Sequence, residues 1–157
     1  MYRHILVPTD GSELSNQAIE YAAALAKSVN AKLTVLTVTI PYYGFAVEPE
    51  LVTIGFDAYQ KNATKLAMHD LDIAKDIAMA AQVPCDVVYQ EHPQPYQAII
   101  DTAQNRGCDA IQMASHGRRG VSAMVLGSET LKVLTHSTIP VLVVRPKVDP
   151  TAFLKGS

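Results

Sequence analysis

The chain has 157 residues, of which 48% are hydrophobic and 18% are charged, as is typical of one compact globular domain. Its 13 basic and 15 acidic residues give a formal net charge of −2, so no basic field attracts nucleic acid or an anionic membrane. No apolar run approaches the roughly 18 residues of a transmembrane helix, and we expect a cytoplasmic protein that contacts neither membrane nor nucleic acid.

The two cysteines, Cys85 and Cys108, are far apart and form no CxxC or Cys/His spacing. Neither a protein-built metal site nor a disulfide framework is therefore indicated. We interpret both cysteines as small buried hydrophobic residues.

Apolar runs and helical periods alternate along the chain. Five short apolar runs predict strands at residues 5–7, 33–40, 85–90, 110–114 and 141–144. Segments with helical spacing, or bounded by Pro and Gly, predict helices at residues 18–29, 56–83, 95–106 and 128–137. In the long second helix the apolar positions are Leu66, Ile73, Ile77 and Ala81. Residues 41–55, with glycines, prolines and no sustained period, predict a long connection.

This alternation predicts an α/β fold, an open five-stranded parallel sheet of Rossmann-like type covered by four helices. We expect a single domain over residues 1–146 and a loose tail over residues 147–157. In such sheets a ligand binds outside the carboxyl ends of the strands, where the strand order reverses. For the order 3-2-1-4-5, that switch point lies between the first and fourth strands.

A glycine-containing loop follows the fourth predicted strand. Residues 114–128 read ASHGRRGVSAMVLGS, with Gly117 followed by nine residues and then Gly127 and Ser128 at the start of a helix. A glycine lets the backbone approach a phosphate closely, and a helix start presents N–H groups and a positive dipole end. The pattern is neither a Walker A motif nor the Rossmann GxGxxG fingerprint. It predicts another kind of nucleotide cradle.

Four segments carry a family resemblance: ILVPTDGSELS at 5–15, SHG at 115–117, LGSET at 126–130 and IPVLVVRP at 139–146. Over residues 2–146 the chain resembles the universal stress protein (UspA-like) family, which implies a five-stranded parallel sheet with four helices. The ATP-binding branch is marked by G-x2-G-x9-G followed by Ser or Thr. Here that frame is Ala114-x2-Gly117-x9-Gly127-Ser128, with alanine in place of the first glycine.

The resemblance implies a binding site for ATP, or ADP or AMP, with Mg²⁺. It implies that Pro8, Thr9 and Asp10 border the adenosine and that the backbone at Val38 contacts adenine. It also implies that Met113 and Ala114 line the ribose. The phosphates would be held by Gly117, Gly127, Ser128 and the backbone N–H of Glu129.

Two of these residues could have a structural role, as helix caps, instead of a role in ligand binding. Asp10-x-x-Glu13 is a capping-box-like start for the first helix, so Asp10 is either a helix cap or a ligand contact. Ser128 is a preferred N-cap residue, but a helix start facing a glycine loop is also where phosphate binds.

The loop residues after the fourth strand leave similar alternatives open. His116 either polarises a phosphate or hydrogen-bonds its own turn, the commoner use of a turn histidine. Arg118 and Arg119 either screen phosphate charge or belong to a solvated basic loop.

The leading hypothesis is an ATP-binding stress protein in which nucleotide occupancy sets conformation or partner choice, with at most slow hydrolysis. No catalytic residue is predicted, because no P-loop lysine, Walker-type acid or placed base can be identified. The alternative is a nucleotide-free homodimeric interaction module, motivated by Ala114. An adenylyl-transferring or pyrophosphatase enzyme is a third hypothesis, but its HxGH or SGGxDS signatures do not occur.

We also expect a homodimer through the last strand, Val141–Val144, which Pro140 and Pro146 bound. In the order 3-2-1-4-5 this apolar run lies at a sheet edge, and unpaired backbone groups on such an edge favour two-fold pairing with a second copy. The family resemblance implies the same arrangement.

Overall fold

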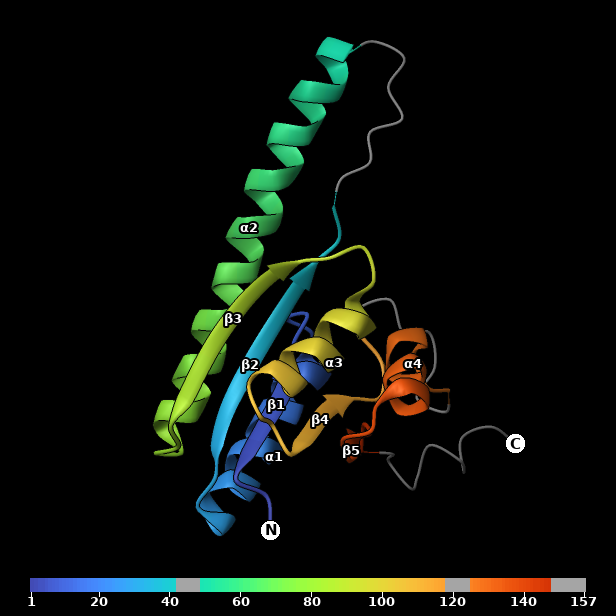
Figure 1. The fold of residues 1–157 in the computed structure, drawn as a ribbon. Coiled ribbons are helices and arrows are strands. Elements are labelled where there is room, and N and C mark those ends of the chain that lie inside the picture. The colour runs from blue at the N-terminus through green and yellow to red at the C-terminus, as the bar shows by residue number, and fades with distance from the viewer. Residues whose placement is uncertain (42–48, 118–124, 148–157) are drawn as a thin grey trace, which may run out of the picture.

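The computed structural model describes residues 1–41, 49–117 and 125–147, and side chains in all of these except 49–54. These residues form five strands and four helices (Figure 1), in the order β1 (His4–Pro8), α1 (Glu13–Val29), β2 (Lys32–Thr39), α2 (Pro49–Ala80), β3 (Cys85–Glu91), α3 (Pro95–Asn105), β4 (Ala110–Ala114), α4 (Ser128–His136) and β5 (Val141–Val144). The predicted tail, residues 147–157, lies outside this description beyond Lys147.

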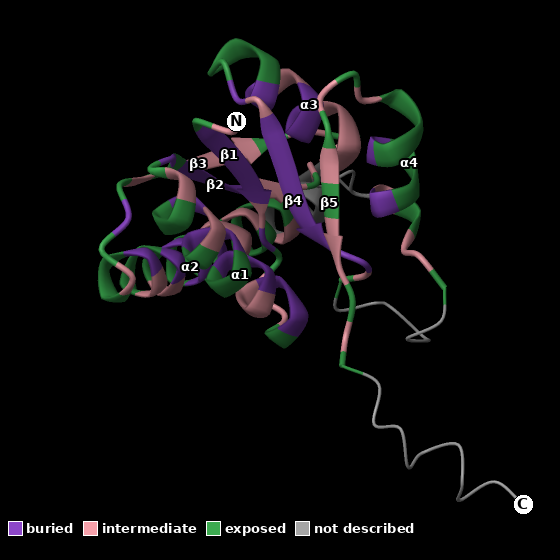
Figure 2. Cartoon of the chain, turned by 90° about the horizontal axis from the view of Figure 1, so that it is seen from below, coloured by how far each residue is buried: buried purple, intermediate pink, exposed green. Residues whose placement is uncertain are grey.

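The strands form one parallel sheet in the order β3-β2-β1-β4-β5, which confirms the predicted topology. Helices α1 and α2 cover one face, and α3 and α4 cover the other (Figure 2). The central strand β1 is consequently buried on both faces, and Ile5, Leu6 and Val7 are each 0% exposed. This is why it reads as a continuous apolar run instead of an alternating one.

Helix α1 is bounded by two capping residues. Ser12 is its N-cap, and the Ser12 side chain accepts a hydrogen bond from the Ser15 N–H at 3.2 Å. Asn30 ends it in the left-handed conformation, with φ of 57°, which asparagine adopts more readily than most residues. The chain therefore turns directly into β2.

Helix α2 starts earlier than predicted. Residues 49–55 are helical, so the interpretation of 41–55 as one connection is wrong for that part. Pro49 is the first helical residue, where a missing N–H costs nothing. Gly55 lies inside the helix at a cost of about 1 kcal/mol that a helix of 32 residues tolerates.

The side of α2 that faces the sheet is formed mainly by small residues. Ala67, Leu71, Ala74 and Ala78 are buried, and Ile77 packs against the same core, whereas Leu66 is 44% exposed. The alanines let the helix lie close to the sheet. Figure 1 shows the amino-terminal part of α2 extending past the ends of β2 and β3. None of the helices in the described part of the chain is long and apolar enough to cross a membrane.

Strand β5 is the last strand of the sheet on the side of β4. It pairs in parallel with β4, from Ile111 opposite Val141 to Ala114 opposite Val144. In contrast to the buried β4, its residues are half-buried or exposed, with Leu142 at 36% exposure (Figure 2).

Candidate functional site

The predicted switch point lies between β1 and β4, which are neighbours in the sheet. Ile5 pairs with Ala110 and Leu6 with Ile111, so the two strands run side by side in the same direction. The turn after β1 and the loop after β4 therefore leave the same edge of the sheet, the one formed by the carboxyl ends of its strands. The start of α4 returns to this edge.

The turn after β1 is held by Thr9. The Thr9 N–H donates to the Leu36 carbonyl at 2.9 Å, and the buried Thr9 hydroxyl lies 3.0 Å from the Ser15 hydroxyl. The Gly11 N–H donates to the same Thr9 oxygen at 3.2 Å, and Gly11 has φ of 76°. The Thr9 side chain thus shapes the turn, and Pro8 precedes it as the half-buried last residue of β1.

Asp10 is not the N-cap of α1, which corrects the capping-box interpretation. Ser12 is the N-cap, and the Asp10 Oδ1 accepts from the Ser12 N–H at 3.0 Å in an Asx turn. The Asp10 Oδ2 lies at the position that a Cβ on Gly117 would fill. The carboxylate therefore bridges the turn after β1 and the loop after β4.

The two ends of the glycine loop are fastened together. The Gly127 N–H donates to the Ser115 carbonyl at 2.7 Å, and the Thr130 hydroxyl donates to the Ala114 carbonyl at 2.9 Å. A Cβ on Gly127 would lie 3.2 Å from the His116 Cα and 3.4 Å from the Ser115 oxygen. The φ of Gly127 is an ordinary −63°, so the backbone conformation does not favour glycine. Glycine is favoured here because its backbone lies so close to the Ser115 and His116 backbone.

Ser128 is not the N-cap of α4, which corrects that interpretation of the residue. Gly127 occupies the cap position without a side-chain cap, and Ser128 is the exposed first helical residue, followed by Glu129. The first N–H groups of a helix have no partner within the helix. An uncapped helix start beside a closed glycine loop is a favourable position for an anion.

Of the residues predicted to contact the adenine and the ribose, Met113 and Ala114 have buried side chains and Val38 is half-buried. Ala114 is 8% exposed and lies in extended β4, opposite Val144, without the positive φ that would demand glycine. Met113 is 5% exposed and packs in the core under α3 and α4. Val38 is half-buried near the end of β2 and pairs with Gln90. A ligand at this edge would meet their backbone groups.

The polar loop residues are only partly described. The His116 Nδ1 lies 3.2 Å from the Ser115 hydroxyl, so this histidine hydrogen-bonds within its own loop. Arg118 and Arg119 lie outside the described residues.

A cleft of about 640 Å³ adjoins this edge on the side of α1. Of the predicted site residues that the structure describes, it includes only His116 and Gly117. The other described residues of its lining come from α1 with its cap and from the segment after β5: Ser12, Glu13, Leu14, Gln17, Glu20, Tyr21, Pro146 and Lys147. Sequence reasoning missed these residues. The polar outer positions of α1 were a signal that could have indicated them, but this spacing also describes any solvated helix face.

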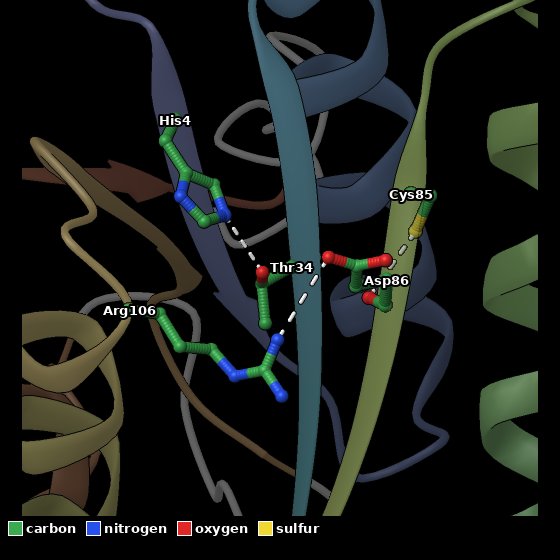
Figure 3. Close-up of polar contacts among 5 residues, drawn as sticks. All are labelled: His4, Thr34, Cys85, Asp86 and Arg106. Carbon is green, nitrogen blue, oxygen red and sulfur yellow. Dashed lines mark hydrogen bonds and ion pairs between the residues drawn. The ribbon is translucent and has the colours of Figure 1, made fainter.

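A polar cluster occupies the opposite end of the sheet (Figure 3). The buried His4 has its Nε2 2.7 Å from the Thr34 hydroxyl, and burial, with the positive charge of Lys32, lowers the His4 pKa. The Arg106 guanidinium lies 3.8 Å from the Asp86 carboxylate. These contacts join β1, β2, β3 and the end of α3, away from the glycine loop.

Burial raises the pKa of both cysteine thiols to about 11. Cys108 is buried, as predicted, whereas Cys85 is only half-buried. Within the described ranges, no three His, Cys, Asp or Glu side chains gather in a way that could hold a metal ion.

Comparison with known proteins identifies the family. The model of the universal stress protein family matches residues 1–145. Universal stress protein YxiE of Bacillus subtilis is 32% identical over 152 residues, covering 92% of this chain and all of that protein. The structure of MJ0577, a universal stress protein of Methanocaldococcus jannaschii, has a TM-score of 0.79 at 27% identity, covering 95% of this chain and 99% of that one. A universal stress protein solved in complex with cAMP has a TM-score of 0.70 at 25% identity, covering 93% and 99%. The chain belongs to the universal stress protein family.

Proposed function

We propose that this protein binds ATP, or ADP or AMP, with Mg²⁺ at the edge of the sheet between β1 and β4, and acts in stress responses as a nucleotide-dependent switch. The observation that carries the proposal is the way in which the glycine loop joins α4. The Gly127 N–H donates to the Ser115 carbonyl at 2.7 Å, and α4 begins directly after Gly127 without a side-chain cap. That geometry offers backbone N–H groups to phosphate oxygens.

Three further observations support an adenine nucleotide with its phosphates and Mg²⁺. A related universal stress protein was solved with cAMP, which carries an adenine base, a ribose and a phosphate. Gly117 is exposed and has no side chain, so a phosphate can approach its backbone closely. Mg²⁺ would arrive with the nucleotide, and the Asp10 carboxylate is an oxygen donor of the kind that Mg²⁺ takes directly or through water.

Binding, and not turnover, is the proposed activity. Efficient phosphoryl transfer requires a positioned base or a lysine on the phosphates. His116 is the titratable side chain of the described loop, and it is bonded to Ser115 within that loop. We therefore assign no catalytic residue and expect hydrolysis to be slow at most.

The test is calorimetric titration of the purified protein with Mg·ATP, together with mass spectrometry of any nucleotide released on denaturation. Adenosine is the matched ligand, because it keeps the base and ribose but lacks phosphates. We expect micromolar binding of Mg·ATP and much weaker binding of adenosine. The absence of both heat and released nucleotide would contradict the proposal.

We further propose that the protein is a homodimer through β5. Strand β5 ends the sheet next to β4, and the half-buried valines on it, Val141, Val143 and Val144, would be covered by antiparallel pairing with a second copy.

The same pairing would serve the alternative function, a nucleotide-free interaction module. Ala114 motivated this alternative, but its φ is not positive, so the backbone here does not exclude alanine. The structure therefore gives no reason to prefer the nucleotide-free module.

A further inference from the structure

The side chain of Glu129 makes an unexpected contact for a residue in the first turn of α4. Its Oε2 accepts a hydrogen bond at 2.8 Å from the backbone N–H of Tyr96, 33 residues earlier in the chain. Tyr96 is the second residue of α3, and α3 lies beside α4 on the same face of the sheet (Figure 1). The carboxylate of one helix start thus caps the start of its neighbour.

Helix α3 needs this cap, because its own residues do not supply one. Its N-cap residue, Gln94, makes no side-chain cap bond, and Pro95 has no N–H. The Gln94 carbonyl accepts from the N–H groups of Gln97 at 3.1 Å and Ala98 at 3.3 Å, which leaves the Tyr96 N–H for Glu129. A carboxylate at a helix start is also favoured by the helix dipole.

Helix α4, in contrast, keeps its own start open. A glutamate in the first turn commonly bonds the N–H groups of its own helix, where it would compete with a phosphate. Here the Glu129 carboxylate is directed to α3, and Gly127 provides no side-chain cap. The charge of the carboxylate is balanced by Lys132, whose Nζ lies 3.5 Å from Glu129 Oε1 and 5.6 Å from the Tyr96 ring centre.

We propose that Glu129 is a positioning residue for phosphate: its carboxylate anchors the first turn of α4 to α3 and so holds the N–H groups of Ser128 and Glu129 open towards the glycine loop. This inference rests on the proposed nucleotide binding. It assigns a role to the Glu129 side chain, whereas the family resemblance concerned only its backbone N–H.

Two variants separate this role from simple charge repulsion. Glu129→Gln keeps an oxygen that can accept from the Tyr96 N–H, whereas Glu129→Ala removes the acceptor. If the carboxylate only repelled phosphate, both variants would bind Mg·ATP more tightly. If it positions α4, Glu129→Ala weakens binding by about tenfold, and Glu129→Gln stays within about twofold of wild type.

The experiment measures backbone amide exchange without nucleotide and the Kd for Mg·ATP in the same proteins. We expect Glu129→Ala to accelerate exchange at Tyr96 and in the first turn of α4, and Glu129→Gln to restore protection. Asp109→Ala is the matched control, since its carboxylate accepts from the backbone N–H groups of Arg3 and His4 at the opposite end of the sheet. It should lower the Tm without changing the Kd.

The possible failures differ from one another. Unchanged exchange at Tyr96 in Glu129→Ala would overturn the anchor, whatever the protein binds. Faster exchange with an unchanged or tighter Kd would overturn the positioning role. A wild-type protein that binds no nucleotide while Glu129→Ala still loosens both helix starts would overturn the proposed function, and the phosphate part of this inference with it.

Discussion

Gly117 faces the carboxylate of Asp10 across the switch point between β1 and β4. A Cβ built on Gly117 would overlap Asp10 Oδ2, so a side chain here would displace the carboxylate, whose Oδ1 accepts from the Ser12 N–H at 3.0 Å. Two segments more than a hundred residues apart in sequence thus meet where position 117 has no side chain.

This contact gives the first prediction. Gly117→Ala should weaken Mg·ATP binding by roughly tenfold, about 1.4 kcal/mol, and Gly117→Val should abolish it, because each side chain displaces Asp10 and fills phosphate space. The φ of Gly117 is not left-handed and the residue is exposed, so stability should change by less than about 1 kcal/mol. Calorimetry and thermal denaturation measure both effects. Unchanged affinity in Gly117→Val would place the site elsewhere.

The second prediction concerns the departure from the family motif. Ala114 is extended, and its carbonyl is held by the Thr130 hydroxyl, so the backbone already has the conformation that a ribose contact needs. Ala114→Gly should change ATP affinity by less than about 1 kcal/mol, the usual difference between the two backbones. A gain of several kcal/mol in a titration would show that the alanine damages the site.

The third prediction tests the dimer. Val143→Lys should raise the monomer fraction in sedimentation experiments, because it introduces a charge into an apolar contact shared by both copies. Met79→Lys is the control, since Met79 is 73% exposed on α2, a helix of the opposite sheet edge. The interface would be refuted by a monomeric wild type at tens of micromolar, or by a Val143→Lys dimer as tight as wild type.

The fourth prediction follows from the polar cluster of Figure 3. Burial, and then Lys32, lower the pKa of His4, while Asp86 and Asp109 act in the opposite direction. In the unfolded chain, the His4 imidazole takes up a proton near the ordinary histidine pKa of about 6.5. Below that pH the unfolded chain therefore binds more protons at His4 than the folded protein does. The free energy of unfolding should therefore fall as the pH drops below about 6.5.

Urea unfolding at several pH values between neutrality and moderate acidity measures this dependence. His4→Gln should remove much of it, whereas the exposed His69→Gln should keep the wild-type dependence. A His4→Gln protein with the full wild-type slope would assign the effect to other groups.

The strands could be located from the sequence because each is a short run rich in apolar and β-branched residues between turn residues. The start of α2 could not, since the segment before Phe56 has two glycines and two prolines and reads as a connection. Its apolar spacing indicated a helix but not the buried face, because small alanines such as Ala74 are buried, whereas Leu66 is exposed.

The meeting of the turn after β1 with the loop after β4 was predictable from the sequence, but the contacts within the candidate site were not. The glycine spacing indicated the loop after β4, but the hydrogen bonds at the starts of α3 and α4 join residues distant in sequence. Glu129 bonds Tyr96, and Gly127 bonds Ser115, through hydrogen bonds that no local pattern encodes.

The central claim is that backbone N–H groups at the glycine loop and the start of α4 bind the phosphates of an adenine nucleotide. Its most direct test is a titration of the ¹⁵N-labelled protein with Mg·ATP, followed by the backbone amide signals. The account predicts that the amides of Gly117, Gly127, Ser128 and Glu129 shift together and saturate with one micromolar Kd, while those of Arg3 and His4 stay in place. Shifts confined to the cleft beside Gln17 and Lys147, or no shifts at all, would contradict it.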